Sequence, residues 1–416
     1  MENLPVEVVG NILSRLMDAR DVVIASGTCK NWREAYRNHL HRLSFSPEAW
    51  PFYRTFDTGF LEGLIRDTII QTTGLQDLSI MTDNDRENSF SASAITAWLT
   101  HTSETLRRLS YNVRSTPYIN VLNCCGWRNL ETLLLVHCPV LSIVSDLQLP
   151  SLKSLSLRHV SISDSDLTCL INACPKIETL ELVWHRITVF GDIELGLTIP
   201  TIKNIYIEGV VLTRIILEVN SIERLHVKDS DFILKLVGNE TLKHFKLEKF
   251  HPLQLDISEA AENLESVDVD YCTFALSELH PLISRAQKLR KLRLWDVIFC
   301  DGIVDLETIA VGFPQLTHLS LGYYPREGFT HYSLQATSQL ESVTVLELGW
   351  TLMNDGLPVW VEGVLERCPN LRKLIIYVAI SVMFFPEDRR MLETFTLSMV
   401  QLMRKHIHVE VQFKYE

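Results

Sequence analysis

The sequence lacks the short motifs by which nucleotide-binding proteins, common hydrolases and zinc proteins are recognised. No G-x-x-x-x-G-K-[ST], G-x-G-x-x-G, H-E-x-x-H or G-x-S-x-G motif occurs in the 416 residues, and no C-x-x-C pair offers a zinc site. The nine cysteines are scattered among apolar residues, and the sequence indicates no partner His or positive environment that would activate one of them. We therefore expect no catalytic residue, no metal and no cofactor.

The sequence also lacks a leader, a membrane helix and an excess of basic residues. The start MENLPVEVVGNIL has an acid at position 2 and no unbroken apolar stretch, which predicts no export. The longest apolar run, residues 375–385, covers about half of the roughly 20 residues that a membrane helix requires. The formal charge of −12 argues against nucleic acid or an anionic membrane as a partner, because either favours a basic face. An odd number of cysteines without a leader indicates reduced thiols in the nucleus or cytoplasm.

The chain does have ample material for a core, since 46% of its residues are apolar and 22% are charged. The first 45 residues show the spacing of three short helices. Side chains at positions 8, 12, 13 and 16 share one helical face, residues 21–26 form a second helical stretch, and Cys29, Trp32 and Tyr36 share a face at spacings of three and four. Helices this short depend on packing, so we expect the bundle to need a further surface to pack against.

A template L-x-x-L-x-L recurs along the remaining sequence. Its fourteen copies begin at Leu40, Leu75, Leu106, Leu130, Leu152, Ile177, Ile202, Ile222, Leu242, Leu264, Leu289, Leu316, Val343 and Leu371. After the first two, the spacings run from 20 to 28 residues, which is the range of leucine-rich repeats. Each copy predicts a short strand that buries its alternate apolar side chains by stacking on its neighbours.

The segments between these strands predict two kinds of backing. Residues 164–176, 306–315 and 360–370 have helical spacing and contain a proline near their ends. The 20-residue repeats that begin at Ile202 and Ile222 leave too little room for a helix, and residues 213–219 alternate like a strand. The closing segment 407–416, in which Ile407, Val409 and Val411 alternate, predicts a last strand that covers the end of the array.

Two sets of residues resemble a known family. The pattern LPxExxxxIxxxL, followed by Asp21 and then Ser26-x-x-Cys29-x-x-Trp32-Arg33, resembles the F-box motif, and the ACPxIExLxL and RCPNLRKLII phrases resemble plant F-box/leucine-rich-repeat proteins. The resemblance implies an α/β architecture with an F-box three-helix bundle over residues 1–45. A curved solenoid of about 13–14 repeats would follow over residues 46–416, with parallel strands on its concave side and helices or extended chain on its convex side.

In that family the F-box binds a Skp-type adaptor, and through it a cullin, in a ubiquitin ligase of the SCF type. The resemblance therefore implies adaptor contacts for Leu4, Pro5, Val8, Ile12, Leu13 and Leu16. An alternative interpretation places Leu16, Ile24, Cys29 and Trp32 in the core of the bundle itself. The repeats would bind a target protein, and catalysis would belong to other subunits of the complex.

The positions between the leucines of each strand face the concave side, so candidate target contacts follow from the sequence. Those that form a basic column beside a tryptophan are Arg224, His226, Lys228, His244, Lys246, Lys291, Arg293 and Trp295, with Asp268 and Asp270 interrupting the column. Basic side chains beside an exposed Trp would suit an acidic or phosphorylated peptide, whereas the plainer interpretation is a solvated strand surface.

Two other functions remain open on the sequence alone. A hormone or metabolite co-receptor of the same architecture would need a defined pocket lined by basic and aromatic residues of the strands. Related hormone receptors hold an inositol phosphate, but no basic cluster here matches that site. A scaffold that has lost adaptor binding would keep only the repeats, and the intact Leu4, Pro5 and Trp32 argue against it.

Overall fold

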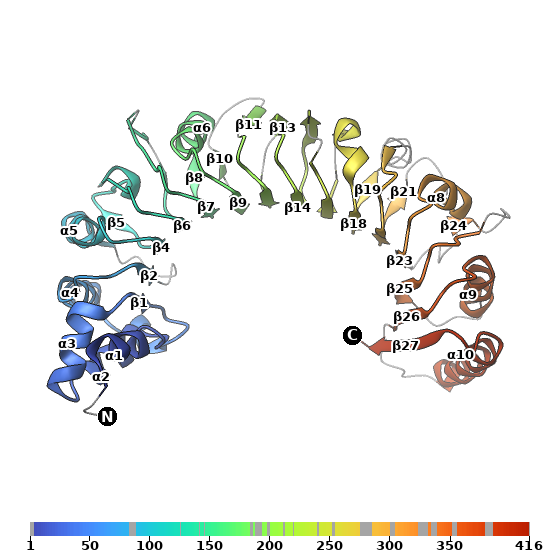
Figure 1. The fold of residues 1–416 in the computed structure, drawn as a ribbon, viewed down its shortest axis with the longest axis horizontal. Helices are drawn as coiled ribbons and strands as arrows, with labels where there is room; N and C mark the ends of the chain where they lie inside the picture. The colour runs from blue at the N-terminus through green and yellow to red at the C-terminus, as the bar shows by residue number, and fades with distance from the viewer. Residues whose placement is uncertain are drawn as a thin grey trace. The chain divides into compact units, whose positions relative to one another are not determined.

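The computed structural model describes most of the chain as two compact units. The described residues are 4–82, 89–124, 126–140, 142–144, 146–183, 186–187, 194–197, 200–210, 213–218, 220–238, 241–251, 254–274, 285–299, 304–322, 332–333, 339–351, 356–378 and 386–415. Residues 1–193 and 201–211 belong to the first unit, and residues 194–200 and 212–416 belong to the second. Within each unit the strands of a long sheet lie on one side and the helices lie on the other (Figure 1).

The first unit begins with the three expected helices, α1 (Val6–Leu13), α2 (Ala19–Ser26) and α3 (Lys30–His39). Asp18 caps α2, because its Oδ1 atom accepts a hydrogen bond from the amide of Arg20 at 2.8 Å. Helices α1 and α3 pack closely at Gly10, where a Cβ atom would lie 2.4 Å from the carbonyl oxygen of His39. A side chain at Gly10 would therefore push the two helices apart.

A parallel sheet follows directly in the first unit. Its strands, in spatial order, are β1 (Arg42–Phe45), β2 (Asp77–Met81), β4 (Arg108–Asn112), β6 (Thr132–Val136), β7 (Ser154–Arg158), β9 (Thr179–Val183) and β12 (Asn204–Glu208). The pairing keeps the fourth position of each template in register, from Leu43 through Leu78 and Leu109 onward, and each of these side chains is almost fully buried. Burying one such side chain contributes roughly 1.5–3 kcal/mol, so the in-register leucines account for the stacking.

Helices, short strands and 3-10 turns cover the other side of the first unit. They are η1 (Pro51–Arg54), α4 (Thr58–Ile70), β3 (Phe90–Ser91), α5 (Ala92–Thr102), β5 (Ser115–Thr116), η2 (Val121–Asn123), β8 (Ser161–Ile162), α6 (Asp164–Asn172) and β10 (Arg186–Ile187). Helix α6 confirms the helix expected over residues 164–176 and begins at the side chain of Ser163, which accepts a hydrogen bond from the amide of Asp166.

The second unit repeats the arrangement. Its long parallel sheet contains β14 (Arg224–Ser230), β16 (His244–Phe250), β18 (Ser266–Asp270), β20 (Lys291–Trp295), β23 (His318–Gly322), β25 (Val345–Thr351), β26 (Lys373–Val378) and β27 (Glu410–Tyr415). Its buried register runs through Leu225, Phe245, Val267 and Leu292 and continues through the strands that follow as far as Leu374 in β26, whereas its partner Val411 in β27 is only half-buried.

The backing of the second unit is extended where the repeats are shortest. A parallel sheet of β11 (Glu194–Leu197), β13 (Arg214–Glu218), β15 (Ile233–Val237) and β17 (Gln254–Asp256) confirms the strand expected over residues 213–219. The remaining backing elements are η3 (Ser258–Asn263), β19 (Thr273–Phe274), β21 (Ile298–Phe299), β22 (Val304–Asp305), α8 (Leu306–Gly312), β24 (Tyr332–Ser333), α9 (Gly356–Arg367) and α10 (Pro386–Lys405).

The last strand differs from the expectation in one respect. It begins at Glu410 rather than at Ile407, and the side chain of Ile407 is 89% exposed. Helix α10 extends to Lys405 and the turn after it occupies residues 406–408, so the alternation of Ile407 and Val409 falls on a turn. Among the described residues, no helix combines the length and the apolar character needed to cross a membrane.

Candidate functional site

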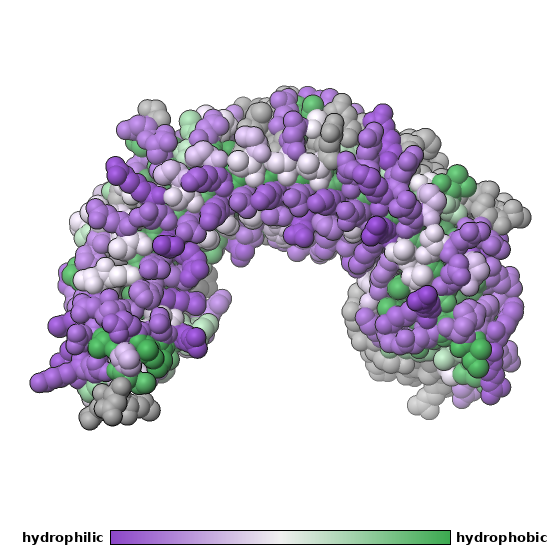
Figure 2. All heavy atoms as spheres, viewed as in Figure 1, coloured by the Kyte–Doolittle hydropathy of each residue, from purple (hydrophilic) through white to green (hydrophobic). Residues whose placement is uncertain are grey.

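The helix bundle of the first unit presents apolar side chains to solvent on one side of α1. Leu4, Val8 and Ile12 are 38%, 41% and 39% exposed, and Pro5 is exposed beside them. We refer to Leu4, Pro5, Val8 and Ile12 as the apolar face of the bundle. Figure 2 shows apolar residues gathered over this part of the chain. Four neighbouring apolar side chains that the fold leaves uncovered are the usual mark of a protein interface.

Other residues of the bundle lie elsewhere than the sequence suggested. Leu13, expected among the adaptor contacts, is fully buried between the helices, so its side chain belongs to the core. Leu16 is half-buried, as are Cys29 and Trp32. Ile24, assigned by the alternative interpretation to the core, is instead 58% exposed, because the buried side of α2 is formed by Ala19, Val22 and Ser26.

The bundle is joined to the first repeat by polar and aromatic contacts. The hydroxyl of Tyr36 donates to the carbonyl oxygen of Thr68 in α4 at 2.6 Å, and the hydroxyl of Tyr53 donates to Asp18 Oδ1 at 3.0 Å. Burial raises the pKa of Tyr36 to about 12 and also raises the pKa of Asp18. These buried bonds fix the bundle against α4 and η1 of its own unit.

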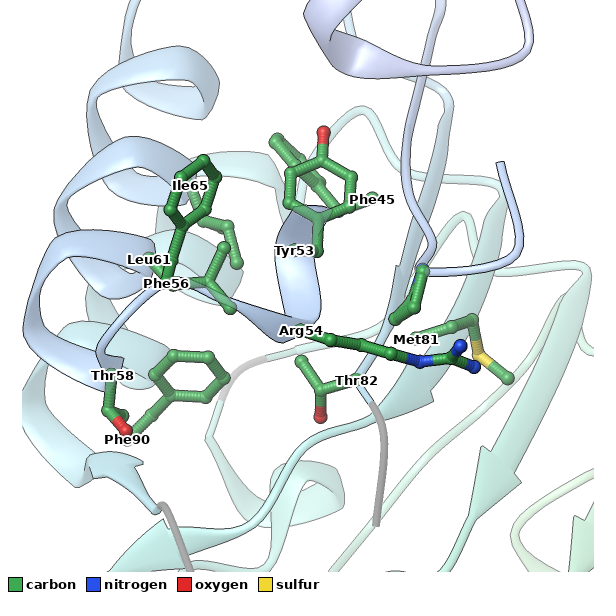
Figure 3. Close-up of a pocket in the computed structure, with 11 residues that line it drawn as sticks. Phe45, Tyr53, Arg54, Phe56, Thr58, Leu61, Ile65, Met81, Thr82 and Phe90 are labelled. Atoms are coloured by element: carbon green, nitrogen blue, oxygen red, sulfur yellow. The ribbon is translucent and has the colours of Figure 1, made fainter. Parts of the chain in front are cut away.

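A pocket lies at the carboxyl ends of β1 and β2 in the first unit (Figure 3). Its cavity volume is about 50 Å³, and aromatic side chains form much of its wall. In Figure 3, Phe45 and Tyr53 lie on one side of the pocket, Phe56 and Leu61 lie on another, and Phe90 lies below these two. An apolar group of modest size fits such a lining better than an anion does.

The strand face of the second unit carries the expected target residues, and their charges are largely paired within the sheet. Lys246 Nζ lies 3.1 Å from Glu248 Oε2, and Lys228 Nζ and His226 Nε2 lie 3.9 Å and 3.7 Å from the same carboxylate. Burial by itself would raise the pKa of Glu248, but Lys246 and its neighbours hold that pKa below its ordinary value. Three of the predicted basic contacts therefore surround one acid.

Arg293 is paired in the same way. Its guanidinium lies 3.3 Å from Asp268 Oδ2 and 3.3 Å from Asp270 Oδ2, so the two acids bind this arginine rather than merely interrupting a basic column. Burial raises the pKa of Asp270 to about 6, even though Arg293 acts in the opposite direction. The guanidinium also stacks 3.8 Å from the ring centre of Trp295, within the range of a cation–π contact.

Trp295 was expected to be exposed, and this expectation is wrong, because its side chain is only 6% exposed. Two glycines give Trp295 its room, Gly349 beneath the indole and Gly322 against the backbone of Trp295. A Cβ atom at Gly349 would lie 2.5 Å from Trp295 Cε2, and one at Gly322 would lie 2.6 Å from Trp295 Cα. The ring of Tyr377 packs edge-on against the indole at 5.0 Å. Trp295 therefore forms part of the strand face rather than projecting from it.

A polar chain continues from the indole. Trp295 Nε1 donates to Ser320 Oγ at 2.6 Å, and this hydroxyl donates to Glu347 Oε2 at 3.3 Å. His318 Nε2 lies 3.4 Å from the same carboxylate, and this contact is the main reason that the pKa of Glu347 is lowered. Of these residues, Ser320 and His318 were missed by sequence analysis. Small residues at strand-face positions, such as Ser320, Gly322 and Gly349, were the available signal.

The remaining predicted residues lie at the amino ends of their strands. Arg224, His244 and Lys291 occupy the first positions of β14, β16 and β20. Within the described ranges, no carboxylate lies within ion-pair distance of Arg224 or Lys291. The two residues between them in the paired row, His244 and Ser266, carry no fixed charge. Among the predicted basic residues that the structure describes, Arg224 and Lys291 thus form no ion pair, although the charge of Lys291 helps to lower the pKa of Glu347.

The cysteines that the structure describes carry no sign of activation. Burial raises the pKa of Cys138, Cys174 and Cys368 to about 12 and that of Cys272 to about 11, so these thiols are neutral at physiological pH. Across the described part of the chain, no three His, Cys, Asp or Glu side chains come together as a metal site.

Comparison with known proteins assigns both parts of the chain. An F-box-like family model matches residues 1–45, and a model described as the leucine-rich repeats of FBD-associated F-box protein At5g56370 matches residues 98–243. The chain is 55% identical over 421 aligned positions to the F-box/LRR-repeat protein At1g67190 of Arabidopsis thaliana, with 100% of both chains covered. It is also 27% identical over 195 positions to the F-box protein At1g10780 of the same plant, with 44% of each chain covered. With an F-box bundle at its start, in-register leucine strands behind it and a full-length relative of the same build, the chain belongs to the plant F-box/leucine-rich-repeat protein family.

Proposed function

We propose that this protein is the substrate-recognition subunit of an SCF-type ubiquitin ligase. The F-box would dock a Skp-type adaptor, the adaptor would connect it to a cullin, and the repeats would hold a target protein for ubiquitination. The observation that carries the proposal is the apolar face of the bundle, because an F-box that exposes Leu4, Pro5, Val8 and Ile12 has a surface suited to an adaptor.

The role of the chain in ubiquitin transfer would be positioning rather than chemistry. Holding the target near the charged ubiquitin carrier raises the effective concentration of the reacting groups, which is a large part of the catalysis in such complexes. The buried thiols with raised pKa values support this division, because none of them is suited to accept ubiquitin as a thioester. A nuclear or cytoplasmic location belongs to the same proposal, and the free thiols of all seven described cysteines are in keeping with it.

The adaptor part of the proposal is tested by binding. The full chain and a variant with Leu4→Ala, Pro5→Ala and Ile12→Ala would be titrated with a purified Skp-type adaptor and cullin. We expect the wild-type chain to bind and the variant to bind at least tenfold more weakly, since exposed anchors of this kind carry most of an interface energy. Ile70→Ala is the matched control, because Ile70 is 47% exposed at the far end of α4. Absence of wild-type binding would contradict the proposal.

The target would bind the strand face of the second unit, at the basic residues at the amino ends of β14 and β20 that form no ion pair. Arg224 and Lys291 are the residues best placed to pair with an acidic or phosphorylated segment, because Arg293, Lys246 and Lys228 already face carboxylates. Lys291→Glu should weaken binding to a library of acidic and phosphoserine peptides by about tenfold. Lys235→Glu in β15 makes the same charge change in the other sheet of this unit and should leave binding unchanged. Equal binding by all three proteins would refute this assignment.

The co-receptor alternative receives no support from the pocket of Figure 3. That pocket is lined by Phe45, Tyr53, Phe56 and other residues of the first repeats, whereas the alternative requires one lined by the basic and aromatic residues of the strand face.

A further inference from the structure

A group of aromatic side chains lies on the surface of the first unit just after the F-box. Trp50, Phe52, Phe56 and Phe60 form a continuous cluster, which we call the aromatic patch. The ring centres of Trp50 and Phe52 are 5.9 Å apart, those of Trp50 and Phe56 are 5.4 Å apart, and those of Phe56 and Phe60 are 4.9 Å apart. Phe52 is 60% exposed and Phe60 is 56% exposed.

Contacts within the chain leave the side chains of Phe52 and Phe60 largely uncovered. Trp50 and Phe56 are half-buried and hold the cluster together, but the outer faces of Phe52 and Phe60 contact solvent. Contiguous exposed aromatic rings are uncommon on the surface of a protein that binds nothing there, and they are enriched at the centres of interfaces. The pocket of Figure 3 adds depth next to the patch, because Phe56 belongs to both.

The patch is physically continuous with the F-box. The guanidinium of Arg20, in helix α2, lies 5.0 Å from the ring centre of Trp50. Next to it, Tyr53 donates a hydrogen bond to Asp18, which caps the same helix. Helix α2 of the F-box and the patch thus adjoin each other within one unit and are joined by a buried hydrogen bond.

The apolar face of the bundle is too small to form a stable interface by itself. A specific complex buries about 800 Å² on each partner and engages about 20–30 residues. The apolar face has four residues, and the exposed Val23 and Ile24 of α2 add two more on the helix that carries Arg20. A partner that extends its contact over α2 would meet Trp50 next, because Arg20 of that helix lies against its ring.

We propose that the aromatic patch extends the adaptor-binding surface, so that the Skp-type adaptor contacts Phe52 and Phe60 as well as the F-box. This inference rests on the proposed function. It assigns adaptor contacts to residues 50–60, which lie outside the F-box, and it makes the adjoining pocket the receptor for an apolar side chain of the adaptor.

The test compares four proteins in the same adaptor titration. The full chain carrying Phe52→Ser and Phe60→Ser should bind the adaptor at least tenfold more weakly than the wild-type chain, because two aromatic contacts are lost. Ile70→Ser changes another exposed apolar residue, at the far end of α4, and should bind like wild type. The Leu4→Ala, Pro5→Ala, Ile12→Ala variant separates the two proposals. If wild type binds, this variant fails and the Phe52 and Phe60 variant binds normally, the F-box proposal stands and the patch proposal is overturned.

A second measurement uses the unaltered protein. Amide hydrogen exchange of residues 50–60 should slow on addition of the adaptor, together with that of α1 and α2. Unchanged exchange in residues 50–60 while α1 becomes protected would overturn the inference. So would a change in the oligomeric state of the Phe52 and Phe60 variant with unchanged adaptor affinity, because the patch would then join two copies of this chain.

Discussion

The slot that holds Trp295 leads to a quantitative prediction about two glycines. In the second unit the indole lies over Gly349, and an added Cβ would meet three ring atoms at 2.5, 2.7 and 2.9 Å. Gly349→Ala therefore forces the indole to move away from Tyr377 and Ser320. Overpacking of this kind costs about 1–3 kcal/mol, and we expect the free energy of unfolding to fall by that amount.

The same substitution should have the opposite sign when the indole is absent. In a Trp295→Ala background the ring atoms that obstruct the Cβ no longer exist. Alanine in place of a strand glycine then stabilises by about 0.5–1 kcal/mol, because the unfolded chain loses conformational freedom. The double-mutant cycle should consequently give a coupling energy of about 1.5–4 kcal/mol between positions 295 and 349.

Gly322 supplies the control for this cycle. Its added Cβ would meet the backbone of the neighbouring strand, at 2.6 Å from Trp295 Cα and 2.7 Å from the amide nitrogen of Asp296. Gly322→Ala should therefore cost the same with or without the indole. The assay is urea unfolding followed by fluorescence and circular dichroism for each single and double variant. A Gly349→Ala penalty that survives Trp295→Ala would refute the geometry argued here.

Two further predictions concern titratable groups. The raised pKa of Asp270, about 6 in the folded chain against an ordinary value near 3.8, means that the folded state binds the proton more tightly than the unfolded state does. The stability that this group contributes is fully present below the ordinary pKa and is lost as the pH rises through about 6. In urea unfolding, the wild-type free energy of unfolding should therefore fall by roughly 2–3 kcal/mol between pH 4 and pH 7 because of this group, and Asp270→Asn should remove that fall. An unchanged pH profile in the variant would contradict the assignment. The second prediction concerns the thiols, which would be alkylated in the folded protein at pH 8 and located by mass spectrometry. The exposed Cys169 should be labelled well before Cys138, Cys174 and Cys368, because burial raises the pKa values of these three to about 12. Comparable labelling rates would show that those three are not buried.

Much of the fold could be predicted because the repeat places one buried side chain at a fixed position in every strand. The template marks the fourth residue of each copy, and the structure pairs Leu43 with Leu78 and Leu78 with Leu109 in that register. The extended backing near residues 213–219 followed from two observations, since a 20-residue repeat has no room for a helix and these residues alternate like a strand. The end of the array was harder to predict, because Ile407 alternates with its neighbours but lies in a turn after α10.

The candidate sites were less accessible from the sequence, and the reason is geometric. Periodicity in α1 identifies a face but does not tell which side of it contacts α3, so Leu13 was grouped with the exposed Val8 and Ile12. The aromatic patch was missed because residues 50–60 have no repeat or helix period of their own. Their relation to Arg20 appears only when η1 folds back against α2.

On the strand face of the second unit, basic residues at neighbouring sequence positions do not by themselves produce a positively charged surface. Neighbouring parallel strands lie about 4.8 Å apart, so a long side chain on one strand reaches a carboxylate on the next. Arg293 uses this distance to pair with Asp268 and Asp270, which precede it by one strand. Arg224 is different, because the residue in register with it on β16 is His244 rather than an acid. Whether a basic residue on such a sheet forms an ion pair depends on the residues in register with it on the neighbouring strands. A charge reversal at Arg224 or Lys291 should therefore change ligand binding, whereas one at Arg293 should mainly change stability.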